Sequence, residues 1–299
     1  MMMLFGKLAF ASGVFYLFCA AAKPELVKSD RPAPFTEGII YSKASFPAHP
    51  IQPVLKSIDF NSDNIPAQYS RLKDSINLDP VGLQDPMFMS VIFLSPVSGK
   101  STFDKNRFLI ETQSLSYRLI NRVANDTGIF MIRPFNSNSE NIGVVYDATS
   151  MKKIWEKYEI NETEFTIQKT AETDVIATYP CQKMIFNFKG TSGQTLPTRL
   201  IGNIPWKVTV WYSEAFPLSI NTQLPFYFNL PHGILKTQVE FDKAGKNKMV
   251  FEVTKVVPKD VNDDDFKITP FILPLNYPAQ ATKITTGLMS IMANALQDM

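Results

Sequence analysis

The sequence is poor in the residues that carry most catalytic and metal-binding chemistry. It has two cysteines, Cys19 and Cys181, and two histidines, His49 and His232. The histidines lie far apart and have no neighbouring cysteine, so they form neither a zinc-ligand spacing nor a serine–histidine–aspartate grouping. The chain also has no Gly-x-Ser-x-Gly elbow, phosphate-binding glycine-rich loop or His-Glu-x-x-His motif. We therefore expect a protein that is not an enzyme, with no catalytic residue, cofactor or metal ion.

An excess of charge of one sign is lacking too. The chain has 30 basic and 28 acidic residues, a net charge of +2. Such a balance provides no overall basic field for nucleic acid, so we expect no nucleic-acid partner. The acidic run Asp263–Asp265 is expected to be a solvated turn, with a calcium site at 262–265 as the lesser alternative.

Long apolar stretches occur only at the N-terminus. One positive charge at Lys7 precedes an apolar run over 8–18, and three alanines follow at 20–22. This pattern predicts a signal peptide over 1–22, too short for a membrane span, followed by a polar tether over 23–37. We expect an exported protein, periplasmic or extracellular or associated with the outer membrane, without a transmembrane span after signal removal. Cys19 also suggests a lipoprotein site, but Phe18 precedes it where a small residue is needed.

Removal of the signal leaves Cys181 as the only cysteine, so an intramolecular disulfide is excluded. Lys183, two residues on, would share its strand face and could activate the thiol. A buried apolar cysteine within a strand is the other interpretation, and the sequence leaves the two open.

Alternating apolar and polar residues are the strongest positive signal. Residues 233–257 alternate on both sides of a turn at 243–247, which predicts a long antiparallel hairpin. Residues 114–135 predict a second hairpin around the turn 124–128. Two strands alone do not bury enough surface to be stable, so other strands or helices must cover the apolar side.

Helical spacing is confined to a few segments. It predicts two short helices in an insertion over 50–78 and an amphipathic C-terminal helix over 281–299. Residues 150–158 fit a helix and a strand equally well. The nearly continuous apolar run 87–94 predicts a buried strand. The fold class is then mainly β (α+β): a single β-rich domain over 38–280, with a curved antiparallel sheet or unclosed barrel and two or three covering helices.

Three passages resemble the GLPGLI family of exported bacterial proteins of unknown function. Residues 165–183 (FTIQKTAETDVIATYPCQK) are similar to the family's passage E-T-x-x-I-x-G-Y-x-C-x-K, with Phe165 in place of the usual tryptophan. Residues 210–218 (VWYSEAFPL) resemble A-W-Y-T-x-x-I-P-I, and 230–234 (LPHGI) fall where the name-giving hexapeptide would lie. Asn229 and His232 replace its glycines and Gly233 replaces its second leucine, so a sister family of uncharacterised exported proteins fits as well.

The resemblance implies a fold similar to the LolA-type lipoprotein carriers, in which an unclosed barrel encloses an apolar cavity. We therefore expect a binding protein that holds a lipid or a lipidated partner on the concave face of its sheet. The alternative is a structural or envelope-assembly protein with a filled core, acting through contacts with an envelope protein, and an enzyme of unknown class is the third hypothesis. The candidate ligand-binding wall consists of Phe88, Val91, Phe93, Phe186, Phe188, Val239, Phe241, Met249 and Phe251.

Overall fold

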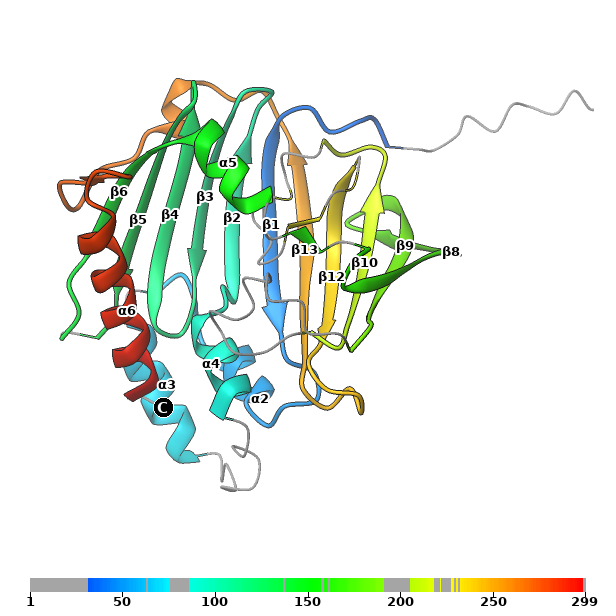
Figure 1. Ribbon diagram of the computed structural model, residues 1–299, viewed down its shortest axis with the longest axis horizontal. Helices are drawn as coiled ribbons and strands as arrows, with labels where there is room; N and C mark the ends of the chain where they lie inside the picture. The colour runs from blue at the N-terminus through cyan, green and yellow to red at the C-terminus, as the bar shows by residue number, and fades with distance from the viewer. Residues whose placement is uncertain are drawn as a thin grey trace, which may run out of the picture. The chain divides into compact units, whose positions relative to one another are not determined.

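A computed structural model describes residues 32–62, 64–75, 86–136, 138–156, 159–160, 162–190, 205–217, 221, 227–228, 230 and 232–297 (Figure 1). The chain divides into a first unit, Met1–Ala33, and a second, Pro34–Met299, which holds all the elements below. The expected signal peptide and most of the tether lie outside the described residues. None of the helices described is both long and apolar enough to cross a membrane.

The chain is mainly β. Its strands are β1 (Gly38–Ser45), β2 (Ser98–Phe103), β3 (Arg107–Gln113), β4 (Tyr117–Ala124), β5 (Thr127–Pro134), β6 (Ile142–Asp147), β7 (Glu159–Ile160), β8 (Phe165–Ile176), β9 (Tyr179–Phe188), β10 (Lys207–Ser213), β11 (Tyr227–Phe228), β12 (Gly233–Glu240), β13 (Lys248–Pro258) and β14 (Leu275–Asn276). The helices are α2 (Gln52–Ser57), α3 (Ile65–Ser75), α4 (Pro86–Leu94), α5 (Ala148–Glu156), η4 (Asp263–Phe266) and α6 (Ala281–Gln297).

Twelve of these strands form one open sheet in the order β14-β6-β5-β4-β3-β2-β1-β13-β12-β10-β9-β8. All its neighbours pair antiparallel except β14 and β6, which are parallel. The short strands β7 and β11 form a separate parallel pair. The order follows the chain from β2 to β6, while β1 pairs with β13, which brings together two segments about two hundred residues apart at the centre of the sheet.

Both predicted hairpins are confirmed. β12 and β13 pair with Val239 opposite Met249, and β4 and β5 pair around Asn125 and Asp126. Both turn residues have positive φ, 50° and 62°, as a two-residue hairpin turn requires. Asparagine and aspartate accept this left-handed conformation more readily than other non-glycine residues, which is why the turn could be predicted.

The strand predicted over Met87–Leu94 is wrong. The run is the helix α4, with Pro86 in its first turn, where proline has no amide hydrogen bond to lose. Phe88, Val91 and Phe93 are at most 3% exposed, and Met89 and Ile92 between them are buried as well, so α4 lies in the core. A short apolar run with no polar face shows no periodicity that separates a buried strand from a buried helix. Of the two alternatives for residues 150–158, the helix is present: α5 extends to Glu156.

The helices expected from spacing are present as α2, α3 and α6, and they gather apolar side chains against the sheet. One buried cluster joins α2, α3 and α4 to residues of β9, β10, β12 and β13. A second, smaller cluster joins Ile284 and Ile291 of α6 to Ile132, Ile142 and Val144. Figure 1 shows α2, α3 and α4 gathered at one end of the strands and α6 beside β6. A third cluster surrounds Phe35 and includes the β8–β9 turn.

Candidate functional site

The predicted ligand-binding wall is part of the main core. Phe88, Val91, Phe93, Phe186, Val239 and Met249 are buried members of the cluster that joins α2, α3 and α4 to the sheet, and Phe188 and Phe241 pack against it. Phe251 is buried as well, at 4% exposed, outside that cluster. The structure therefore brings eight of the nine predicted residues together, although three of them come from a helix.

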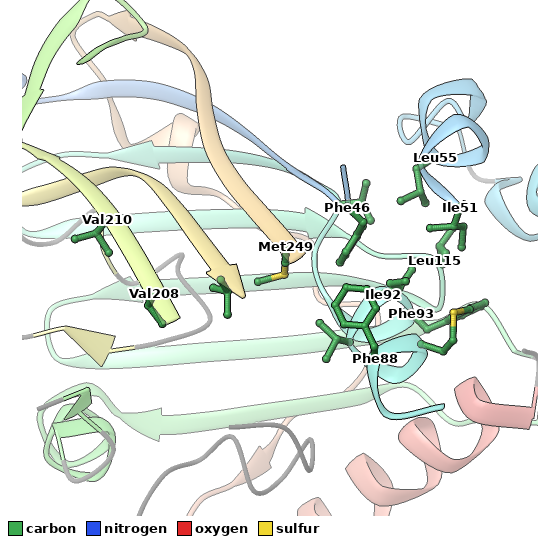
Figure 2. Close-up of a cluster of buried hydrophobic side chains, with 14 of the residues drawn as sticks. Phe46, Ile51, Leu55, Phe88, Ile92, Phe93, Leu115, Val208, Val210 and Met249 are labelled. Atoms are coloured by element: carbon green, nitrogen blue, oxygen red, sulfur yellow. The ribbon is translucent and has the colours of Figure 1, made fainter. Parts of the chain in front are cut away.

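Figure 2 shows three of the wall residues, Phe88, Phe93 and Met249, among the other buried side chains of this cluster. The ring of Phe88 lies 6.0 Å from that of Phe46 and 5.5 Å from that of Phe241, measured between centroids. Tyr69 of α3 meets Phe93 edge to face at 5.4 Å. Such spacings are those of directly packed aromatic pairs. The side chains expected to face a ligand are in contact with other side chains of the protein.

The opposite face of the sheet carries a continuous row of polar side chains. Residues directly opposite on neighbouring strands share a face, so the strand register defines the row. It runs from β5 to β9 through Arg133, Arg118, Gln113, Ser98, Lys43, Glu252, Lys236, Trp211 and Lys183. Since these residues are five basic and one acidic, with one aromatic, we call them the basic row.

Alternation along each strand separates the basic row from the core. Successive residues of a strand point to opposite faces. On most strands at least one chain neighbour of the row member is buried, as are Ile132, Ala44, Phe251, Val210 and Met184, whereas both neighbours of Arg118 are half-buried. The face that bears the row is therefore opposite the one on which Val210 and Met184 join the main cluster, and α2 adjoins the row at the end of β1.

The members of the row on β13, β12, β10 and β9 are in contact with one another and with β8. Lys236 Nζ lies 3.8 Å from Glu252 Oε1 and 5.1 Å from the centre of the Trp211 ring. Lys183 Nζ lies 6.0 Å from the same ring and forms a 2.6 Å ion pair with Glu172 of β8. The indole is thus flanked by two ammonium groups, an arrangement in which cation–π attraction orders the side chains.

A pocket opens at the centre of the row, where the end of β1 meets α2. Its volume is about 480 Å³. It is lined by Lys43, Ser98 and Glu252 of the row, by Gln52, Leu55 and Lys56 of α2, and by Ala44, Ser45, Pro47, Phe60 and Val97. The lining combines an apolar part with two lysines and one glutamate. None of the nine predicted wall residues lines this pocket.

Cys181 is not placed for nucleophilic chemistry. Its side chain is 1% exposed, and its thiol is 3.5 Å from the carbonyl oxygen of Tyr179, to which it donates. Burial raises the pKa of the Cys181 thiol to about 12, far from the range of reactive thiols. Lys183 pairs with Glu172, so the alternative of a buried strand cysteine fits the structure.

The remaining polar groups have structural partners. The carboxylates of Asp263, Asp264 and Asp265 each contact a different basic side chain, those of Arg107, Lys267 and Lys259, at 2.5–2.7 Å. Asp265 and Asn262 also cap η4 reciprocally. The acidic run therefore forms a capped, ion-paired turn. His232 stacks on Tyr212 at 6.1 Å and 4° between ring planes.

Sequence reasoning missed the basic row. Each of its members follows the alternation that predicts a strand, but the alternation says nothing about which strands are neighbours. Lys43 and Glu252 are cross-strand partners although more than two hundred positions separate them in the chain. Only Trp211 gave a local signal, as an aromatic residue on the polar side of β10.

Comparisons with known proteins give no family. No protein-family model matches the chain, and no curated protein matches it. Among solved structures, it is similar to PNGF-II in space group P21, with 14% identity and a TM-score of 0.37 over 83% of this chain and 33% of that one. The same protein in space group C2 matches with 16% identity and a TM-score of 0.33, over 64% of this chain and 30% of that one. The chain thus spans about a third of the length of these matches, and similarity at this level supports no argument about function.

Proposed function

We propose that this chain is an exported, non-enzymatic protein that acts through contacts with another macromolecule, with a core filled by its own side chains. The observation that carries the proposal is the packing of Phe88 between Phe46 and Phe241. A ligand on the predicted wall would have to displace contacts of this kind, each of which contributes to the stability of the fold. The same packing favours the assembly protein over the carrier of an apolar ligand.

The proposal also includes the curvature of the sheet, the helices that cover it and the family of the protein. The sheet would be curved, with α2, α3, α4 and α6 covering one face, as in the LolA-type layout. Membership of the GLPGLI family or of a sister family would place the protein among exported envelope proteins. Neither relationship assigns an activity to any residue.

A non-enzymatic role has support from the chemistry of the described residues. The thiol of Cys181 is buried and protonated, and the acidic run at Asp263–Asp265 is engaged in ion pairs. Among the residues described, no group of three or more histidine, cysteine, aspartate or glutamate side chains is arranged to hold a metal ion. Binding without chemistry is therefore the simpler proposal.

Native mass spectrometry of the exported protein, purified without detergent, tests the filled core. We expect the mass of the polypeptide alone. The Phe88→Ala variant is the matched control, because it would open an apolar void able to take up a small apolar probe such as benzene, as engineered cavities do. We expect the probe to bind the variant and not the wild type. A lipid that persists on the wild type and leaves on denaturation would overturn the proposal in favour of the carrier.

A further inference from the structure

The basic row and its pocket combine positive charge with an apolar opening; Lys43 and Arg133 are exposed and the other row members are half-buried. We propose that the row and the pocket bind an acidic, extended polypeptide segment of a partner protein, which crosses the strands and places one apolar side chain in the pocket between β1 and α2. This rests on the proposed function, since it names the class of macromolecule that the protein contacts.

Charge complementarity is the first support. Five of the nine row members are basic and Glu252 is acidic, although the whole chain is nearly neutral. Two of the basic residues already have ion-pair partners, Lys236 in Glu252 and Lys183 in Glu172 of β8. Lys43 and Arg133 are exposed, and no acidic side chain of the described residues lies within ion-pair distance of either. A local surplus of one sign on a neutral protein attracts and orients a partner of the other sign.

The lining of the pocket favours an acidic peptide over a charged polysaccharide as the partner. Leu55, Phe60 and Val97 supply apolar lining, and Lys43 and Lys56 lie at the same opening. Its volume of about 480 Å³ falls in the range of about 300–1,000 Å³ found for ligand sites. An acidic peptide offers an apolar side chain beside carboxylates, which matches this lining. A charged polysaccharide has no apolar group to place there.

The dimensions suit an extended chain. Nine strands at a spacing of about 4.8 Å give the row a length of about 38 Å. An extended polypeptide covers that distance with about twelve residues. Trp211 stands near one end, half-buried between Lys236 and Lys183. Tryptophan in such a setting is the residue type that most often dominates an interface.

A synthetic peptide tests the proposal directly. The probe is a fluorescently labelled peptide of about twelve residues, all glutamate except for one central leucine. Anisotropy measures its binding to the full exported chain at low salt. Two matched peptides, one with central serine and one with lysine in place of every glutamate, separate the pocket contribution from the charge contribution. We expect the leucine peptide to bind best, the serine peptide about tenfold more weakly, and the lysine peptide not at all.

Variants of the protein then locate the site. Lys43→Glu and Lys56→Glu are each expected to weaken binding of the leucine peptide by about tenfold. Lys105→Glu, the same charge change at an exposed turn outside the row, should change it by less than about twofold. Ser98→Leu narrows the pocket without creating a void, so it should abolish the preference for leucine over serine. Thermal melting of each variant checks folding, and Lys56 lies on α2, outside the sheet hydrogen bonds.

The remaining outcomes overturn the proposal at different levels. If Lys43→Glu and Lys105→Glu weaken binding of the leucine peptide equally, the peptide is attracted by the overall charge of the protein and does not occupy a defined site. Tighter binding of an acidic polysaccharide with the same dependence on Lys43 would reject the peptide but keep a macromolecular partner. Tighter binding of vesicles of anionic phospholipid with that dependence would reject the peptide in favour of a lipid surface. A lipid retained in the native mass measurement would reject the proposed function itself.

Discussion

Phe88 on α4 and Phe241, the residue after β12, pack with their ring centroids 5.5 Å apart. The contact joins α4 to the turn between β12 and β13. Phe88 is 1% exposed. Aromatic contacts of this kind are among the largest single contributions to a core. Loss of this pair should therefore lower the stability of the packing between α4 and the sheet.

Truncation of Phe88 should be costly. We expect Phe88→Ala to lower the free energy of unfolding by about 3–5 kcal/mol, from the lost apolar contact and the cavity left behind. Urea denaturation followed by circular dichroism measures the change. Leu273→Ala is the control, because Leu273 is 88% exposed and its loss should stay within about 0.5 kcal/mol. Similar effects for both variants would contradict the placement of Phe88 in the core.

Gly128 is required by the tyrosine opposite it. A Cβ at this position would lie 2.0–2.5 Å from ring atoms of Tyr146, whose hydroxyl donates to Asn121 Oδ1 at 2.7 Å. The ring cannot move without losing that bond, so Gly128→Ala should destabilise the protein by about 1–3 kcal/mol. In a Tyr146→Ala background the same substitution should have little effect. A double-mutant cycle in urea measures the coupling, and additive effects would refute the clash.

The β8–β9 turn contains a residue in an unfavourable conformation. Thr178 has φ of 76°, a left-handed value that costs a β-branched residue about 1–2 kcal/mol. We expect Thr178→Gly to stabilise the protein by about 0.5–1 kcal/mol after the extra entropy of glycine in the unfolded chain is subtracted. Thr173→Gly, within the paired part of β8, should instead destabilise it, and thermal melting separates the two.

The thiol of Cys181 should be protected in the folded protein. In a Cys19→Ser background it is the only thiol, and its 1% exposure and raised pKa both disfavour attack on a disulfide reagent. We expect no reaction with Ellman's reagent at pH 8 within the time that unfolded protein reacts completely. Rapid release of one equivalent of thiolate from the folded protein would show that the site is open.

Alkaline pH should weaken the fold through the same group. Burial raises the pKa of Cys181 from 9.0 to about 12, and that of Tyr146 to about 12. The folded state therefore keeps protons that the unfolded state releases, so stability is complete below the ordinary pKa and falls as pH rises above it. Each such group contributes about 1.4 kcal/mol per pH unit. Between pH 9 and 10 free tyrosine is still mostly protonated, so the fall of the urea midpoint with pH should come mainly from Cys181. We expect Cys181→Ala to make this fall less steep. An equally steep fall in the variant would assign the pH dependence to another group.

Local chemistry was sufficient to predict the hairpins. The turn at Asn125 and Asp126 and the alternation on each side of 243–247 involve neighbours in the chain, and local propensity and tertiary structure agree there. The helix α4 was missed for the opposite reason. A run that is apolar at nearly every position satisfies both a buried strand and a buried helix, and the environment chooses between them.

The sequence by itself determined a mainly β chain, its two principal hairpins, the helices at α2, α3 and α6, and the apolar residues of its core. These follow from periodicity and turn chemistry, which act over a few residues. Tertiary structure alone decided that β1 pairs with β13, and with it that Lys43, Glu252 and Lys236 stand side by side on one face. Register between distant strands is set by packing and hydrogen bonding across the whole sheet, so a surface built from nine strands has no counterpart in the linear sequence.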